Sequence, residues 1–439
     1  MCDLVIAGAR LDETEARWDV GIEGEKIAWL RPTRDPSHTG ENCECESRER
    51  IEARGRFLLP GMIDAHVHTR DPGYTGKEDW RSATMAAANG GVTTMMAMPN
   101  CNPPMTNRTA IRLVKQSADA KALVHVALTG GTCAAAPGWI VPSVQAGAVA
   151  MDVYDDMFSC GTGDWLRLFR EAKEMCVPLC FYLMDPQLES LRKKQSLDLG
   201  KDETDVIADA TDGETEALSI ARIFPMAAYF HVPVVLRMVS TKKALEMVRA
   251  MRNLYPDALV YVEICVHYLF LTRDALRIYG SGAHIHPPLR TQQDVDELWH
   301  GVRDGTVDYI ASDHAPHMVK EKNRERLASC ASGMTGLETE LALLLDARSR
   351  GLLSLEDIRR LCCENPANIY GLSSQRGRIS PGYDADLILI DENERWTVNH
   401  QQLYTRGAPG PFEGRELKGK VCVTVCGGRV VMKDGRVIG

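Results

Sequence analysis

Between residue 60 and about residue 381, short apolar stretches alternate with longer stretches whose apolar residues recur every three or four positions. The short stretches have the length of β-strands, and the longer ones have the period of amphipathic helices. Typical predicted helices are residues 79–89, 214–230 and 240–253, and the predicted strands are 61–66, 92–98, 124–129, 147–153, 178–183, 233–238, 259–265 and 308–312. Eight strands separated by helices predict an α/β fold, the (β/α)8 barrel.

Both ends of the chain consist instead of short strands and turns. Their strand-like stretches are residues 3–11, 18–30, 385–390, 421–425 and 429–432. Glycines between these stretches mark hairpin turns. We therefore expect residues 1–59 and 382–439 to join into a small composite β-sandwich, beside a barrel formed by residues 60–381.

Three further stretches lead to local predictions. Ser354 has the character of an N-cap, and its helix is expected to stop near Asn365-Pro366. Residues 34–50 are polar and are predicted to form a loop. Residues 202–216 are acidic and are predicted to form a solvated loop that leads into a helix.

Composition narrows the classes of protein to which the chain can belong. Of its 439 residues, 44% are hydrophobic and 25% are charged, which allows a large core. A net charge of -9 without a basic run argues against a nucleic-acid partner. No apolar stretch is long enough to span a membrane, and the first residues do not resemble a signal peptide. The 14 cysteines are irregularly spaced, which indicates buried free thiols in a reducing cytoplasm rather than a cysteine zinc site.

The first predicted barrel strand ends in a pattern that can bind a metal. His66 and His68 are two residues apart, so in a strand both imidazoles point to the same face. Imidazole suits zinc and similar transition metals. Such a pair alone is weak evidence, but this one follows a buried strand and has Arg70 beside it. We interpret it as part of a metal site.

Polar residues also follow two other predicted strands. Asn100 ends the second strand, and the eighth ends in a segment that contains Asp313 and His317. In barrels of this type the active site lies at these strand ends. Asp313 is suited to complete the metal site and to accept a proton from water, and Arg70 is suited to hold a carboxylate. Taken alone, Asp313 is equally suited to cap a helix and Asn100 to shape a loop.

Together these segments resemble dihydroorotase, of the cyclic-amide branch of the amidohydrolases. The resemblance rests on residues 64–73, 77–79, 98–100, 312–317, 336–339 and 411–414. It runs nearly from end to end. Related allantoinases and dihydropyrimidinases usually lack the arginine after the histidine pair and the Met-Pro-Asn of residues 98–100.

The resemblance implies interconversion of L-dihydroorotate and N-carbamoyl-L-aspartate, a step of pyrimidine synthesis. It implies that His66, His68 and Asp313 bind a divalent metal, zinc above all, and that Asp313 also moves the proton. It implies further that Arg70, Asn100 and His317 hold the carboxylate of the substrate. The protein is expected to be a homodimer or a larger homo-oligomer.

The chain departs from the family pattern at three ligand positions. The family's two-metal site uses a carboxylated lysine on the fourth strand and histidines on the fifth and sixth strands. The matching residues here are Met151, Tyr182 and Met238, which are poor zinc ligands. At most one tightly held ion is therefore expected.

Alternative interpretations follow from these substitutions. A mononuclear enzyme could use Asp152 or Asp155 as a further ligand. A homologue that has lost catalysis could instead be a structural or regulatory partner, for example of aspartate transcarbamoylase. Hydrolysis of another cyclic ureide is a further alternative. His286 lies in a predicted loop, where it could contact the substrate or replace a metal ligand.

Overall fold

The centre of the fold is a closed barrel of eight parallel strands. The computed structural model describes residues 2–33, 47–132, 138, 140–323 and 325–438. In barrel order the strands are β6 (Met62–Val67), β7 (Val92–Ala97), β8 (His125–Thr132), β9 (Ala148–Val153), β10 (Leu179–Tyr182), β11 (Val234–Arg237), β12 (Val260–Cys265) and β13 (Tyr309–Ala311). A parallel bridge between Val67 and His314 connects the two ends of this sheet. The predicted (β/α)8 barrel is confirmed, and each predicted barrel strand overlaps an observed one.

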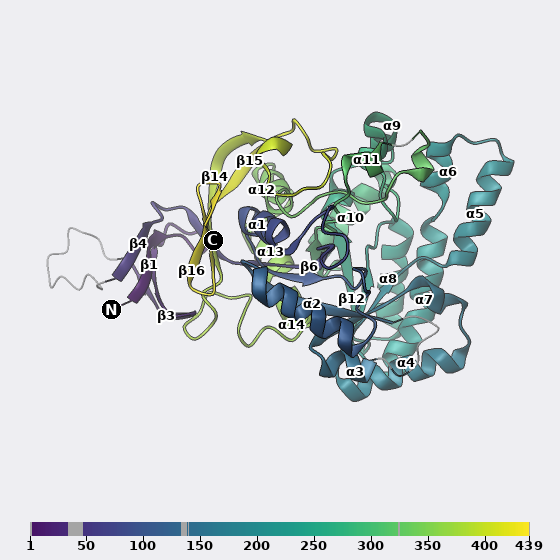
Figure 1. Ribbon diagram of the computed structural model, residues 1–439, viewed down its shortest axis with the longest axis horizontal. Helices are drawn as coiled ribbons and strands as arrows, with labels where there is room; N and C mark the ends of the chain where they lie inside the picture. The colour runs from purple at the N-terminus through teal and green to yellow at the C-terminus, as the bar shows by residue number, and fades with distance from the viewer. Residues whose placement is uncertain (1, 34–46, 133–137, 139, 324, 439) are drawn as a thin grey trace.

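Helices cover the outside of the barrel (Figure 1). The predicted helices are confirmed as α1 (Trp80–Gly90), α7 (Gly213–Phe230) and α8 (Lys242–Leu254). The other helices are α2 (Arg108–Lys121), α3 (Ile140–Gln145), α4 (Thr162–Met175), α5 (Pro186–Asp198), α6 (Glu203–Asp209), α9 (Asp274–Tyr279), α10 (Gln292–Asp304), α11 (Val319–Lys322), α12 (Glu340–Ser349), α13 (Leu355–Arg359) and α14 (Asn365–Ile369). Polar caps fix where they begin: Asp79 and Thr241 accept backbone N–H groups of α1 and α8.

The two chain ends form two sheets that pack against each other beside the barrel (Figure 1). The first sheet contains β1 (Cys2–Ala9), β2 (Trp18–Glu23), β3 (Lys26–Pro32) and β4 (Ser47–Glu52). The second contains β5 (Phe57–Pro60), β14 (Leu387–Thr397), β15 (Glu416–Cys426), β16 (Arg429–Lys433) and β17 (Arg436–Val437). Alternating apolar residues of both sheets, such as Ile6 and Leu387, share one core. The predicted β-sandwich is confirmed, while its boundaries at residues 59 and 382 stay a prediction.

Three local predictions differ from the structure. The helix after Ser354 does not stop near Pro366, because a π-helical turn at residues 360–364 carries the chain into α14. A π turn is a place where a helix can accommodate proline, which lacks the N–H donor. The acidic stretch contains α6. Its Asp205 pairs with Arg277 of α9 and with Arg273, the residue just before α9. Residues 47–50 belong to β4, and residues 34–46 of the predicted loop lie outside the described part.

The buried thiols fit the sequence prediction. Cys180, Cys265 and Cys422 are free and buried. In the described part of the chain, no helix is long and apolar enough to cross a bilayer.

Candidate active site

The ends of β6 and β13 bring three predicted residues together. His66 and His68 have ring centroids 5.4 Å apart. Nε2 of His66 lies 3.5 Å, and Nε2 of His68 lies 3.1 Å, from Oδ1 of Asp313. The backbone of Asp313 is in the left-handed region, with φ 44°, which is uncommon for residues other than glycine. The chain thus leaves its strand in a strained turn that points this carboxylate at both imidazoles.

Each histidine has its other nitrogen bonded to a different oxygen. Nδ1 of His66 lies 2.7 Å from Oε1 of Glu263, which is on β12. Nδ1 of His68 lies 2.8 Å from Oδ1 of Asn100. Because these oxygens can only accept, we infer that both Nδ1 atoms carry the hydrogen and both Nε2 atoms offer a lone pair. The Tyr182 hydroxyl, 3.2 Å from Nε2 of His66, is consistent with this assignment because it can donate there.

Burial and charge set the protonation of this group. Burial and the charge of Arg70 lower the pKa of His68 to about 4, so it is neutral at pH 7. Burial opposes the ionisation of Asp313, but the two histidines outweigh it and lower its pKa. Burial opposes the charge of His66 as well, but Glu263 and Asp313 raise its pKa. Asp313 is therefore an ionised carboxylate at neutral pH.

The donor chemistry of this cluster fits one divalent ion. Its two imidazole nitrogens and one carboxylate oxygen lie within 4.8 Å of one another, and all three residues are buried. Nitrogen and oxygen donors of this kind suit zinc. In the described part of the chain, His66 belongs to one other such group, with Glu263 and Cys265, and neither group includes Asp152 or Asp155.

On β9, the side chain that enters the barrel is Asp152 rather than Met151. Met151 belongs to the core between strands and helices, and its sulfur lies against Gly130. Alternation along the strand turns the next side chain inward. The family comparison assigned the lysine position to Met151, and the structure assigns the inward position to Asp152. This aspartate is fully buried and accepts a hydrogen bond from Nε of Arg237 at 2.8 Å.

Arg237 places a positive charge inside the barrel. It is the last residue of β11, and its side chain has no exposed area. Its guanidinium pairs with Asp152 and, at 2.6 Å, with Oε2 of Glu263. Met238, the predicted sixth-strand ligand position, follows with φ 54° and is buried. The residues of β9, β10 and β11 therefore do not fit a second ion.

Asp155 and His286 each lie near Glu189, away from the histidine pair. Burial, with the negative charge of Glu189, raises the pKa of Asp155 to about 7. His286 has its Nε2 atom 3.7 Å from a carboxylate oxygen of Glu189, on α5. The structure thus brings these two predicted residues near Glu189, and it does not bring them into the cluster of His66, His68 and Asp313.

A basic group lies beside the histidine pair. Arg70, with φ 62°, is buried and donates through Nε to the Pro316 carbonyl. Its Nη2 lies 3.3 Å from Nε2 of His317, and Nζ of Lys77 lies 3.2 Å from the Nδ1 of that ring. Burial, Arg70 and Lys77 lower the pKa of His317 to about 3, so this ring is neutral. Nζ of Lys77 is already paired with Oε1 of Glu321 at 3.0 Å, so Arg70 is the cation that suits an anion next to the candidate metal ligands.

Three residues of the site were not singled out from the sequence. Lys77 stands in a recognisable segment, but its contact with His317 needed the fold. Glu263 and Arg237 lie in strands that read as apolar, and a charged residue inside such a strand was the available signal. A charge that is buried is normally paired or functional, and this could have drawn attention to both.

Comparison with known proteins shows which family the chain resembles. The amidohydrolase family matches residues 57–175 and 236–431. A dihydroorotase of Methanothermobacter thermautotrophicus is 32% identical over 100% of this chain and 96% of its own length. A dihydroorotase of Geobacter metallireducens is 35% identical over 88% of this chain and 90% of its own.

The fold is also that of a solved hydrolase. The L-hydantoinase (dihydropyrimidinase) from Arthrobacter aurescens superposes with a TM-score of 0.91 at 26% identity, over 100% of this chain and 98% of the other. Sequence relatives and fold therefore agree on hydrolysis of a cyclic amide. The chain belongs to the amidohydrolase family, as a dihydroorotase-like member.

Proposed function

We propose that the protein is a mononuclear dihydroorotase, which interconverts L-dihydroorotate and N-carbamoyl-L-aspartate. The observation that carries the proposal is the meeting of His66, His68 and Asp313 beside the buried guanidinium of Arg70. The cluster would hold one divalent ion, zinc above all. When bound, such an ion supplies Lewis acidity, which makes water nucleophilic at neutral pH.

The residues of the chain account for the proton transfers. In hydrolysis, the water oxygen bonds to the ring carbonyl carbon while Asp313 accepts a water proton. The ring carbon–nitrogen bond then breaks, and Asp313 returns the proton to the departing nitrogen, which becomes the carbamoyl amide. The same steps in reverse close the ring. Because the pKa of Asp313 is low, the carboxylate is ready to accept at neutral pH.

Substrate selection is proposed to rest on the basic group. Arg70 and His317 would hold the carboxylate that distinguishes dihydroorotate from simpler cyclic amides. Asn100 has its oxygen on His68, so its amide N–H₂ remains to donate to the substrate. His286 lies next to Glu189, and we propose that the loop which contains His286 contacts the substrate. Asp152 is proposed to act as the partner of Arg237 rather than as a metal ligand.

Two other functions have an observation in their favour. The hydantoinase-like fold supports hydrolysis of another cyclic ureide. The side chains of Tyr182, Met238 and Arg237 support a homologue without catalysis, acting as a structural partner of an enzyme such as aspartate transcarbamoylase. In either case the chain is proposed to form a homodimer or homo-oligomer.

An assay of both directions distinguishes these functions. Dihydroorotate hydrolysis and carbamoyl-aspartate cyclisation are measured with added zinc, cobalt or manganese. We expect metal-dependent turnover that is roughly a hundredfold or more slower than that of a two-metal enzyme, because one ion activates water without the second ion's polarisation of the amide. Background activity with every metal, in folded protein that binds the ligand, would support the structural partner. Turnover of hydantoin alone would support the other ureide.

A further inference from the structure

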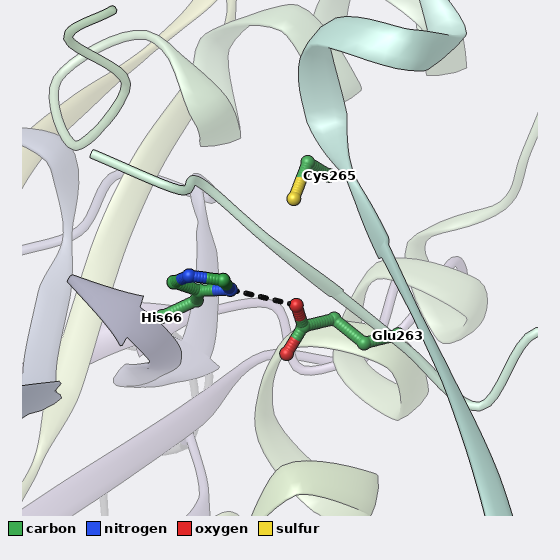
Figure 2. Close-up of side chains that lie close together, drawn as sticks. All are labelled: His66, Glu263 and Cys265. Carbon is green, nitrogen blue, oxygen red and sulfur yellow. Dashed lines mark hydrogen bonds and ion pairs between the residues drawn. The ribbon is translucent and has the colours of Figure 1, made fainter. Parts of the chain in front are cut away.

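The carboxylate of Glu263 is held rigidly against His66. Figure 2 shows the ring of His66 with one nitrogen directed at Glu263, and the thiol of Cys265 nearby. The other carboxylate oxygen of Glu263 accepts from Nη1 of Arg237 at 2.6 Å and from the Tyr309 hydroxyl at 2.5 Å. His66, Glu263, Arg237 and Tyr309 are all fully buried. Hydrogen bonds therefore hold both carboxylate oxygens of Glu263 in place.

Arg237 is held in turn by residues of two other strands, β9 and β6. Its Nε donates to Asp152, and its Nη1 also donates to the Ala65 carbonyl at 3.2 Å. Two carboxylates share this one guanidinium, and the Glu263 carboxylate also faces His66. The negative charge of Glu263 favours a cation on the far side of the ring.

We propose that Glu263, fixed by Arg237 and Tyr309, is a positioning residue that holds His66 in the tautomer needed for metal binding. With Nδ1–H donated to Glu263, the Nε2 lone pair points towards Asp313, where the ion is proposed to bind. Carboxylates that accept from a ligating histidine in this way orient the ring and raise its basicity. The inference rests on the metal role proposed for His66.

A second arrangement of the same residues must be distinguished from this one. His66, Glu263 and Cys265 also have ligand atoms within 4.8 Å of one another. An ion bound there would need a carboxylate oxygen of Glu263, and both of these oxygens already accept hydrogen bonds. The hydrogen bond therefore favours an ion on the Nε2 side, without the thiolate.

The Glu263→Gln variant tests the proposal sharply. Arg237 can only donate, so the Gln oxygen must face it and the amide N–H₂ must face Nδ1 of His66. His66 would then switch tautomer and carry its hydrogen on Nε2, which blocks the ion. We expect zinc affinity, measured by chelator competition on the full-length protein, to fall roughly 10- to 100-fold. Nitrogen-15 NMR of the histidines should show the tautomer switch, which a merely structural role would not produce.

Two further variants separate positioning from folding. Glu216→Gln is the matched control, because Glu216 is equally buried and pairs with Arg290 at 3.0 Å. It should lower stability and leave zinc affinity within about twofold. If Glu263→Gln does not fold, Tyr309→Phe removes one donor to the same oxygen. We expect it to weaken zinc binding between about twofold and tenfold, the range for one hydrogen bond.

Specific results would overturn the proposal. Unchanged zinc affinity in Glu263→Gln, or an equal loss in Glu216→Gln, contradicts a positioning role. A thiolate-to-metal charge-transfer band in the cobalt-loaded wild type would place the ion at Cys265 instead. Wild type that binds no zinc also overturns it. Wild type that binds zinc without turnover contradicts the proposed enzyme function and leaves this inference standing.

Discussion

Two sides of the barrel mouth offer opposite chemistry to a metal. On one side, β6 and the segment after β13 present two imidazoles and a carboxylate, those of His66, His68 and Asp313, with ligand atoms within 4.8 Å of one another. On the other side, β9 and β11 present Asp152 and the guanidinium of Arg237, which neutralise each other. The first side attracts a divalent cation, and the second already contains a fixed cation. The comparison teaches that two parts of one barrel mouth can differ in charge, with a cluster of metal-type donors on one side and a buried ion pair on the other.

The side of the barrel mouth that contains His66, His68 and Asp313, here called the donor side, should be essential for turnover. Asp313→Asn keeps the shape of the side chain but removes the charge and the proton acceptor. We expect hydrolysis of dihydroorotate to fall to background, a loss of at least about a thousandfold, or about 4 kcal/mol of transition-state stabilisation. The measurement is a steady-state assay of zinc-loaded protein, with circular dichroism to check the fold. Robust activity in this variant would show that the assigned mechanism is wrong.

The opposite side should matter most for stability. Arg237→Met leaves two buried carboxylates without their cation, which should lower the free energy of unfolding by about 3–5 kcal/mol. Urea denaturation measures the change. Arg395→Met is the control, because Arg395 forms an exposed ion pair with Glu416 and should cost less than about 1 kcal/mol. Equal, small effects of both substitutions would refute a structural role for the buried charge.

The basic group around Arg70 should control ligand affinity rather than folding. Arg70→Ala removes a buried guanidinium beside His317, so binding of dihydroorotate or carbamoyl aspartate should weaken by about 1.5–3 kcal/mol, the range for a charged hydrogen bond. Isothermal titration calorimetry checks this, with Arg395→Ala as a control that should bind as wild type does. Undetectable binding to wild type, or no difference between the two variants, would count against a carboxylate site.

The smallest effect is expected at Asp155, outside the donor cluster. Burial and Glu189 raise its pKa from 3.8 to about 7. An acid whose pKa is raised by folding costs no stability below its unfolded pKa. The penalty grows as pH rises from about 4 to about 7 and is complete above it. Asp155→Asn should therefore stabilise the protein at pH 8, on the order of 1–2 kcal/mol, and by less at pH 5.

Urea denaturation at both pH values measures this difference. The control is Asp119→Asn, because Asp119 is exposed and pairs with Lys115 in an i,i+4 contact. Its effect should be small and nearly the same at both values. A gain from Asp155→Asn that did not grow with pH would contradict the buried, unpaired state of this carboxyl group.

The proximity of His66, His68 and Asp313 could be predicted from the sequence because it depends on local rules. The alternation of a strand places His66 and His68 on one face, and a parallel barrel brings Asp313 to the same edge. The opposite side could not be predicted in this way. Whether Met151 or Asp152 faces inward depends on register, and a shift of one residue exchanges the two faces. The network of Arg237 with Glu263 joins residues 26 positions apart and needs the closed barrel.

Long-range contacts also explain the local errors. The acidic stretch looked solvated, yet Glu216 is buried because Ser240, Thr241 and Arg290 satisfy it. Proline at position 366 looked like a helix end, yet a π turn before it lets the helix continue. Both outcomes depend on neighbours that single-sequence patterns do not contain.

The most direct test of the contrast between the two sides is the metal content of the purified protein. Elemental analysis after equilibration with zinc and removal of free ion should give one ion per chain for wild type. His66→Ala should reduce it to none, because that variant removes a donor from the only side proposed to bind. Two ions per chain, both lost in His66→Ala, would contradict the account, since the side that contains Arg237 would then also bind a metal.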